Sequence, residues 1–147
     1  MDAVEFKNQL MDLMRDVSVN MGTTFIPIIN KYDLTIIQTQ ILREIKDNKD
    51  HSIGSLAKMM SIQSGNTSSM CKQLEKKGYL QRHRDKSDER VVKIALTDKG
   101  LSTIDEIDNT LKERYSSIFS SEDPDNLRAI IFGLQNLKDL LIRMNQV

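Results

Sequence analysis

Residues 52–100 decide the fold, and they read SIGSLAKMMSIQSGNTSSMCKQLEKKGYLQRHRDKSDERVVKIALTDKG. Apolar residues recur at i, i+3, i+4 and i+7 in residues 53–60, and the same spacing returns in residues 67–74. This period places the apolar side chains on one face of each of two short helices. The break between the helices is short, and Gly78 stands where a left-handed residue commonly ends a helix. The stretch therefore predicts a helix-turn-helix over residues 53–77.

The residues that follow change to the two-residue period of a β-strand. Apolar side chains alternate with other residues from Val92 to Leu96, and a charged, turn-forming run at residues 85–89 separates this strand from the one before it. Two strands joined by a charged loop after a helix-turn-helix form a winged helix, with the wing predicted over residues 79–97. Thr97 is suited to cap the next helix.

The second helix of the pair has an unusual outward face. Its members are small, hydrogen-bonding or cationic, and none is acidic; they are Gly65, Asn66, Ser68, Ser69, Lys72, Gln73 and Lys76. Asparagine and glutamine can read adenine edges, and lysine can reach guanine or phosphate, so this face predicts entry into a DNA major groove. The alternative is a plain solvated helix face, although such a face normally mixes both signs of charge.

The net charge of zero hides an uneven distribution along the chain. Residues 52–100 carry ten Lys/Arg and five Asp/Glu, whereas the remaining residues carry eleven and sixteen. A basic module between acidic flanks indicates a polyanionic partner. The cations predicted to contact DNA from the hairpin are Arg82, Arg84, Lys86 and Arg90. The alternative is a surface hairpin with mixed charges.

Long helices flank the basic module. An amphipathic helix is predicted from residue 2 to residue 21, with a break or kink before Pro27, and a Thr35/Gln38 capping box begins another helix. The C-terminal helices carry an apolar stripe wider than one neighbouring helix would cover, which indicates a homodimer. We predict one domain over residues 1–147, mainly α with a small β-hairpin wing, and dimerisation helices at 2–30 and 101–147.

The basic module resembles the MarR family of bacterial transcription regulators. The matching pieces are Leu56-Ala57, Leu74-Glu75-Lys76-Lys77-Gly78-Tyr79-Leu80, Arg82, Arg84-Asp85, Asp88-x-Arg90 and Leu96-Thr97-Asp98-Lys99-Gly100. The resemblance implies a homodimeric winged helix-turn-helix repressor that binds a pseudo-palindromic operator in double-stranded DNA. It also implies that Arg90 reaches the minor groove and that Asp88 supports the wing by pairing with a nearby arginine.

The same resemblance implies an effector pocket for a small aromatic or phenolic ligand. The pocket is expected between the N-terminal helix, the capping-box helix and the basic module, and its expected walls are Met11, Met14, Phe25, Ile29 and Tyr32. The alternative for the methionines is core packing, since methionine fills irregular gaps.

Nothing in the sequence indicates an enzyme, a cofactor or a metal site. His51 and His83 are isolated and are expected at the surface. Cys71 is expected to be a small buried hydrophobic residue, with an oxidation switch as the alternative. The single cysteine and the lack of a signal peptide or of a long apolar run suit a cytoplasmic protein that does not enter the membrane. The competing function is a winged-helix protein-interaction module that does not bind DNA specifically.

Overall fold

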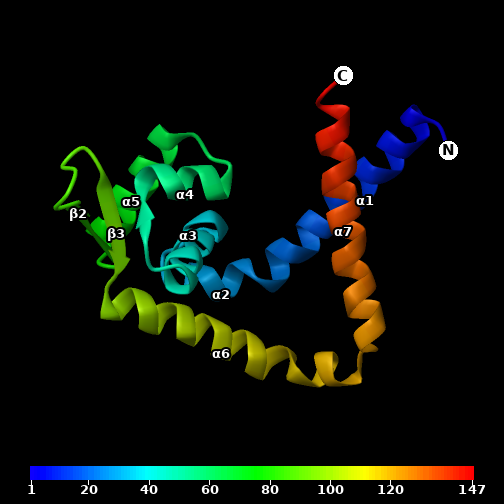
Figure 1. The fold of residues 1–147 in the computed structure, drawn as a ribbon. Helices are drawn as coiled ribbons and strands as arrows, with labels where there is room; N and C mark the ends of the chain where they lie inside the picture. The colour runs from blue at the N-terminus through cyan, green and yellow to red at the C-terminus, as the bar shows by residue number, and fades with distance from the viewer. The chain divides into compact units, whose positions relative to one another are not determined.

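The computed structural model describes all 147 residues, which form two compact units, residues 1–110 and residues 111–147. Figure 1 shows the helices and strands. In chain order they are α1 (Ala3–Thr24), α2 (Ile26–Asn30), α3 (Ile36–Asp47), β1 (His51–Ser52), α4 (Ile53–Met60), α5 (Ser64–Lys76), β2 (Leu80–Arg84), β3 (Val92–Leu96), α6 (Asp98–Ser121) and α7 (Pro124–Met144). Helix α6 begins in the first unit and ends in the second. The predicted fold class, mainly α with a small β wing, is confirmed.

The sheet has three antiparallel strands in the order β1-β3-β2. Strands β2 and β3 form the wing hairpin, in which Leu80 lies opposite Leu96. Strand β1 is absent from the sequence prediction; it pairs His51 with Ile94. A strand of two residues is too short to show a period, so the sequence pattern gives no sign of it.

The position of His51 corrects the sequence prediction of a surface residue. Only 7% of His51 is exposed. Its Nε2 lies 2.9 Å from a carboxylate oxygen of Glu44, and its Nδ1 lies 3.0 Å from the hydroxyl of Ser55. Pairing of β1 with β3 brings the ring between α3 and α4, where these partners satisfy both ring nitrogens. His83 is exposed, as expected.

One hydrophobic core joins α3, α4, α5, the sheet and the start of α6. Its large, deeply buried aliphatic side chains are Ile41, Leu42, Ile45, Leu56, Leu74, Leu80, Ile94, Ile104 and Ile107. Full burial of an aliphatic side chain of this size stabilises the fold by about 1.5–3 kcal/mol. Leu56 and Leu74 come from the two helices predicted by their apolar period, so the predicted buried faces of the helix-turn-helix are the observed ones.

Helix ends within this unit follow the predicted capping residues. The Thr35 hydroxyl accepts from the Gln38 amide, and the Gln38 side chain accepts from the Thr35 amide, which completes the capping box of α3. Gly78 has φ +81° after α5, and the Tyr79 amide donates to the Leu74 carbonyl at 2.9 Å. This is the left-handed glycine ending that the sequence predicts.

The start of α6 packs closely against the chain reversal after α5. The Thr97 hydroxyl donates to the Gly78 carbonyl at 2.6 Å and accepts from the Gly100 amide at 3.0 Å. The Thr97 amide donates to the Tyr79 carbonyl at 3.1 Å. A Cβ added at Gly100 would lie 2.0 Å from the Tyr79 carbonyl oxygen, so only glycine permits this approach.

The N-terminal helix differs slightly from its predicted extent. Helix α1 continues through Gly22 to Thr24, and the break falls at Phe25, before Pro27. Proline lacks an amide hydrogen and is accepted in the first turn of a helix, which explains why a new short helix begins here.

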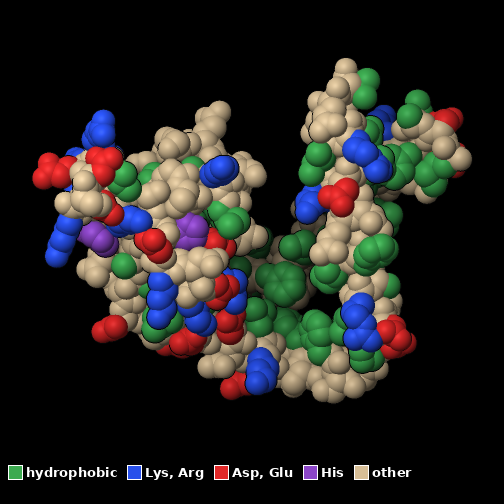
Figure 2. Space-filling model, viewed as in Figure 1, with side chains coloured by type: hydrophobic (Ala, Val, Ile, Leu, Met, Phe, Trp, Pro, Cys, Tyr) green, Lys and Arg blue, Asp and Glu red, His purple; other side chains and the backbone are tan.

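Helices α1 and α7 each lack any buried residue. Figure 2 shows apolar side chains along α7. The large exposed apolar residues of α7 are Ile130, Ile131, Phe132, Leu134, Leu141, Ile142 and Met144. Apolar surface of this extent is typical of an interaction face. None of the helices combines the length and the apolar character needed to cross a lipid bilayer.

Candidate nucleic-acid interface

The turn between α4 and α5 orients the second helix. Ser61 takes the left-handed conformation at φ +53°, and the Ile62 amide donates to the Ala57 carbonyl at 3.0 Å. Thr67 is completely buried, and its hydroxyl donates to the Gln63 carbonyl at 3.2 Å. The Thr67 side of α5 is therefore held against the core, and the opposite side faces outward.

The residues predicted to read DNA lie on this outward side of α5. Those that are exposed are Gly65, Asn66, Ser69, Lys72, Gln73 and Lys76, whereas Ser68 is half-buried. No atom lies within 4 Å of a Cβ added at Gly65, so the helix surface is open there. The one acidic residue of α5 is Glu75, and its carboxylate is engaged by Arg82 of β2.

Arg82 is a predicted DNA contact, and in the structure its side chain pairs with Glu75 of α5. Its side chain is only 25% exposed, and its Nε and Nη2 atoms each lie 2.8 Å from the Glu75 carboxylate. The Arg82 amide also donates to Glu75 at 3.1 Å. These bonds lower the pKa of Glu75, with the side-chain hydrogen bond as the largest cause. Arg82 therefore joins the second helix to the wing. Because folding favours the carboxylate, this stabilisation is lost as the pH falls through the lowered pKa.

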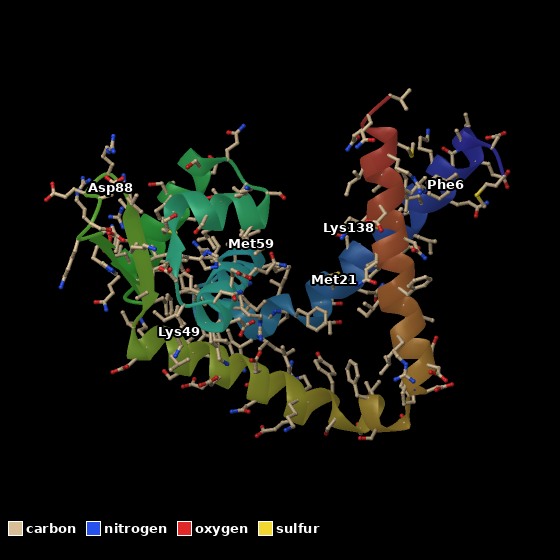
Figure 3. The ribbon with its side chains drawn as sticks, viewed as in Figure 1. Phe6, Met21, Lys49, Met59, Asp88 and Lys138 are labelled. Carbon is tan, nitrogen blue, oxygen red and sulfur yellow. The ribbon has the colours of Figure 1, made fainter.

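The loop of the wing is shaped by hydrogen bonds from aspartates. Asp88, labelled in Figure 3, accepts from the amide of Arg90 at 3.1 Å and from its Nε at 3.2 Å. Asp85 accepts from the hydroxyl and amide of Ser87, and these bonds lower the pKa of Asp85. The loop is thus ordered by its own side chains.

Two cations of this loop face solvent. The Arg90 side chain is 92% exposed despite its bond to Asp88, and Lys86 is exposed. Arg84 is exposed as well, with its Nη1 donating to the Glu89 carbonyl at 2.6 Å. The wing therefore presents positive charge at its tip, as predicted, from three of the four arginine and lysine residues proposed.

The other lysines of the basic module divide into two groups. Lys77 pairs with Asp33 at 3.1 Å, Lys93 pairs with Asp50, and the Lys99 amine lies 4.4 Å from the centre of the Tyr79 ring. The lysines that make no such contact are Lys58, Lys72, Lys76 and Lys86. The positive charge that is free to meet a ligand is therefore concentrated on α4, α5 and the wing loop.

The five residues predicted to line an effector pocket are not brought together. Phe25 lines an open hollow on α1 with Val17 and Met21, and Ile29 lines a separate groove with Ile36. Met11 and Met14 lie exposed on an earlier part of α1, whereas the Tyr32 hydroxyl donates to Glu106 at 3.2 Å. The sequence could not show this, because the apolar period of α1 does not reveal at which residue its contacts with α2 begin.

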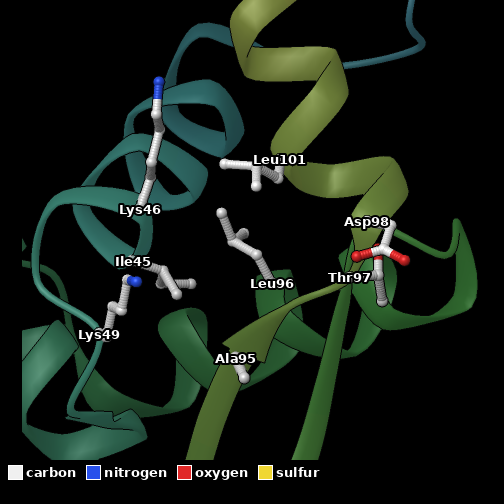
Figure 4. Close-up of a pocket in the computed structure, with 8 residues that line it drawn as sticks. All are labelled: Ile45, Lys46, Lys49, Ala95, Leu96, Thr97, Asp98 and Leu101. Carbon is white, nitrogen blue, oxygen red and sulfur yellow. The ribbon is translucent and has the colours of Figure 1, made fainter.

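A different cavity lies between the end of α3, strand β3 and the start of α6 (Figure 4). Its volume is about 460 Å3, and its walls are Ile45, Lys46, Lys49, Ala95, Leu96, Thr97, Asp98 and Leu101. Lys46 already pairs with Asp105 at 2.7 Å. None of the predicted effector residues takes part in this cavity.

Cys71 is fully buried on the inner side of α5. Burial raises the pKa of its thiol from 9.0 to about 11. The thiolate is the reactive form, so the native protein holds this group in an unreactive state at neutral pH.

This arrangement predicts that Cys71 resists modification until the protein unfolds. Iodoacetamide at pH 8 should label the native chain at least about 100-fold more slowly than the urea-unfolded chain, because burial limits both access and thiolate formation. Mass spectrometry measures the rate, and Cys71 is the only thiol in the chain. Equal rates for native and unfolded protein would instead indicate an accessible, reactive cysteine.

Comparisons with known proteins agree with this geometry. A family model described as transcriptional regulator SarA/Rot matches residues 23–107. The HTH-type transcriptional regulator SarZ of Staphylococcus haemolyticus is 34% identical over 125 residues, which are 82% of each chain. The organic hydroperoxide resistance transcriptional regulator of Bacillus subtilis is 28% identical over 99 residues, 67% of each chain.

Solved structures share the fold at low sequence identity. A MarR variant from E. coli complexed with operator DNA superimposes with a TM-score of 0.77 at 19% identity, covering 93% of this chain and 99% of that one. The S. aureus MepR–DNA complex has a TM-score of 0.75 at 19% identity, covering 88% and 96%. The MarR-type winged helix predicted from the sequence is confirmed, and the chain belongs to the SarA/Rot family of transcriptional regulators.

Proposed function

We propose that this protein regulates transcription by binding a pseudo-palindromic site in double-stranded DNA as a homodimer. The main support is the distribution of unpaired lysines in the basic module, residues 52–100. Three lysines of this module are engaged by neighbouring groups, whereas Lys58 of α4, Lys72 and Lys76 of α5 and Lys86 of the wing have no ion pair. The exposed polar residues Asn66 and Ser69 share the surface with these lysines, which is the combination required for base reading and phosphate contact.

Dimerisation is assigned to α1 and to the C-terminal helices α6 and α7. The support is the absence of buried residues from α1 and α7 and the large apolar side chains that both expose. A two-fold dimer presents two copies of α5, which fit successive major grooves when they lie about 34–36 Å apart. Each wing then reaches the flanking minor groove through Arg90.

The protein acts as a cytoplasmic repressor, and a small aromatic or phenolic molecule releases it from DNA. Such a molecule shifts the protein only if it binds more tightly to an arrangement that does not fit the groove spacing. Phe25 and Ile29 each line an apolar hollow near the predicted effector region, and this supports a ligand site there.

The proposal is tested by selecting bound sequences from random duplex DNA and then measuring affinity against salt. The three unpaired lysines of α5 and the wing give about six phosphate contacts per dimer, so affinity should fall about a thousandfold between 50 and 200 mM salt. A salt-independent affinity, or the selection of no preferred sequence, would contradict the proposal. The latter results are those expected of a protein-interaction module.

Replacing Lys86 with alanine should weaken binding without changing sequence preference. The Lys86 amine is exposed, and a phosphate contact fixes position but carries no base information. The salt slope should fall by about one for each contact removed, and affinity for the selected site and for random duplex should fall together. Fluorescence anisotropy over a salt series measures both quantities.

Lys31→Ala is the matched control, since it removes the same charge from an exposed position just after α2, outside the basic module and the helices assigned to dimerisation. Its salt slope should equal that of the parent. An equal loss of slope in both variants would show that only the overall charge of the protein is being measured.

A further inference from the structure

We propose that Gln38 of α3 orients the carboxamide of Gln73 so that Gln73 offers only hydrogen-bond donors to DNA. This inference rests on the proposed function, since it assigns the chemistry of one base-reading side chain. It makes Gln38 a positioning residue, buried beneath the surface that it controls.

The orientation of Gln38 follows from a backbone group. The Thr35 amide lies 3.1 Å from the Gln38 side chain. A backbone N–H can only donate, so the atom that it meets on Gln38 must be the carboxamide oxygen, Oε1. This bond is half of the capping box that begins α3, so the stability of the helix start holds the amide in this orientation.

The orientation of Gln73 follows in turn. The other end of the Gln38 carboxamide is Nε2, which lies 3.2 Å from the Gln73 side chain. An amide nitrogen can only donate, so Gln73 must present its own oxygen to Gln38. Gln38 is only 4% exposed, whereas Gln73 is exposed. The end of Gln73 turned away from α3 is therefore its NH2 group.

This orientation restricts the bases that Gln73 can read. In the major groove, guanine presents two acceptors and thymine presents one, whereas cytosine presents a donor. A glutamine free to use both ends can pair with adenine in a bidentate manner. The oxygen of Gln73 is turned toward Gln38 and away from the groove, so the N6 amine of adenine finds no acceptor. We therefore expect Gln73 to favour guanine or thymine on the strand that it meets.

One substitution should reverse this preference. In Gln38→Glu, a carboxylate oxygen still accepts from the Thr35 amide, and glutamate is a normal capping-box residue. The second oxygen can only accept, so Gln73 has to turn its NH2 group inward and its oxygen outward. Gln73 should then favour cytosine or adenine at the same position, by a change in relative affinity on the order of tenfold.

The experiment selects preferred sites from random duplex DNA for the parent, for Gln38→Glu, for Gln73→Ala and for the double variant. The added negative charge of Gln38→Glu lowers affinity for every sequence, so the readout is the ratio of affinities between single-base variants of the site. Thermal unfolding of each variant establishes that it is folded. In Gln38→Met, which has neither donor nor acceptor at the amide position, the preference should become broader and not reverse.

The expected result is a reversed preference at one position per half-site in Gln38→Glu and no preference there in either variant that carries Gln73→Ala. An unchanged preference in Gln38→Glu would overturn the inference while leaving DNA binding intact. A reversal that persists in the double variant would overturn it as well, because the effect would then not pass through Gln73. Should the parent itself select no site, the proposed function fails, and the inference fails with it.

Discussion

Replacing Gly100 with alanine should destabilise the winged helix by about 3 kcal/mol or more, because the new methyl group has no room. The added Cβ would lie 2.0 Å from the Tyr79 carbonyl oxygen, which is a backbone atom and has no rotamer to change. That carbonyl also accepts from the Thr97 amide, so movement of either chain segment breaks the junction between α5 and α6. Urea or thermal unfolding followed by circular dichroism measures the loss.

Gly54→Ala is the matched control for this prediction. Gly54 lies exposed near the start of α4, and an added Cβ would meet only the Ser52 hydroxyl at an ordinary 3.8 Å. Alanine there should leave stability unchanged or raise it by about 0.5–1 kcal/mol, since it restricts the unfolded chain. If the two variants unfold at the same urea concentration, the close approach at Gly100 does not hold the fold.

Replacing Leu134 with aspartate should convert the proposed dimer into folded monomers. Leu134 is 54% exposed within the protomer, so a charge at this position does little to the fold of one chain. Across a two-fold interface the same substitution places two carboxylates in an apolar contact, where unpaired charge is strongly unfavourable. The dissociation constant of the dimer should rise on the order of 100-fold or more. Sedimentation velocity over a range of protein concentrations measures it.

DNA affinity should fall in the same variant, because the two half-sites are no longer bound by one linked molecule. Asn136→Asp is the control, since it adds an equal charge at an exposed position on a different side of α7. The control should remain dimeric. Should Leu134→Asp sediment as a dimer like the control, the interface assigned to α7 is wrong.

The elements that the sequence predicts well are those encoded by residues close together in the chain. The two apolar periods, the Thr35 capping box and the left-handed Gly78 all lie within a few residues of the structure that they specify. Each depends on the local backbone and needs no knowledge of distant neighbours.

The errors lie where a side chain meets a partner that the local pattern does not reveal. In the sequence, Arg82 looks like one more free cation in a basic run. In the structure, β2 packs beside α5 and brings Arg82 to Glu75. His51 is expected at the surface, but it lies in the two-residue strand β1 and is buried. Gln38 and Gln73 are 35 positions apart, so their hydrogen bond exists only in the folded chain. The five residues predicted to line a ligand pocket share a region of the sequence, but in the structure Phe25 and Ile29 line separate hollows.

The bonds between Glu75 and Arg82 have a consequence for how such a protein diversifies. They join the second helix to the wing, and Thr97 joins the end of the wing to the turn after α5, so hydrogen bonds link α5, the wing and the start of α6. The apolar faces of α1 and α7 belong to separate elements that share none of these bonds. In the proposed dimer, substitutions in the first set can therefore alter which bases are preferred, and substitutions in the second can alter the spacing between half-sites. A lineage can thus change the base preference of each half-site and the distance between the two half-sites by independent substitutions.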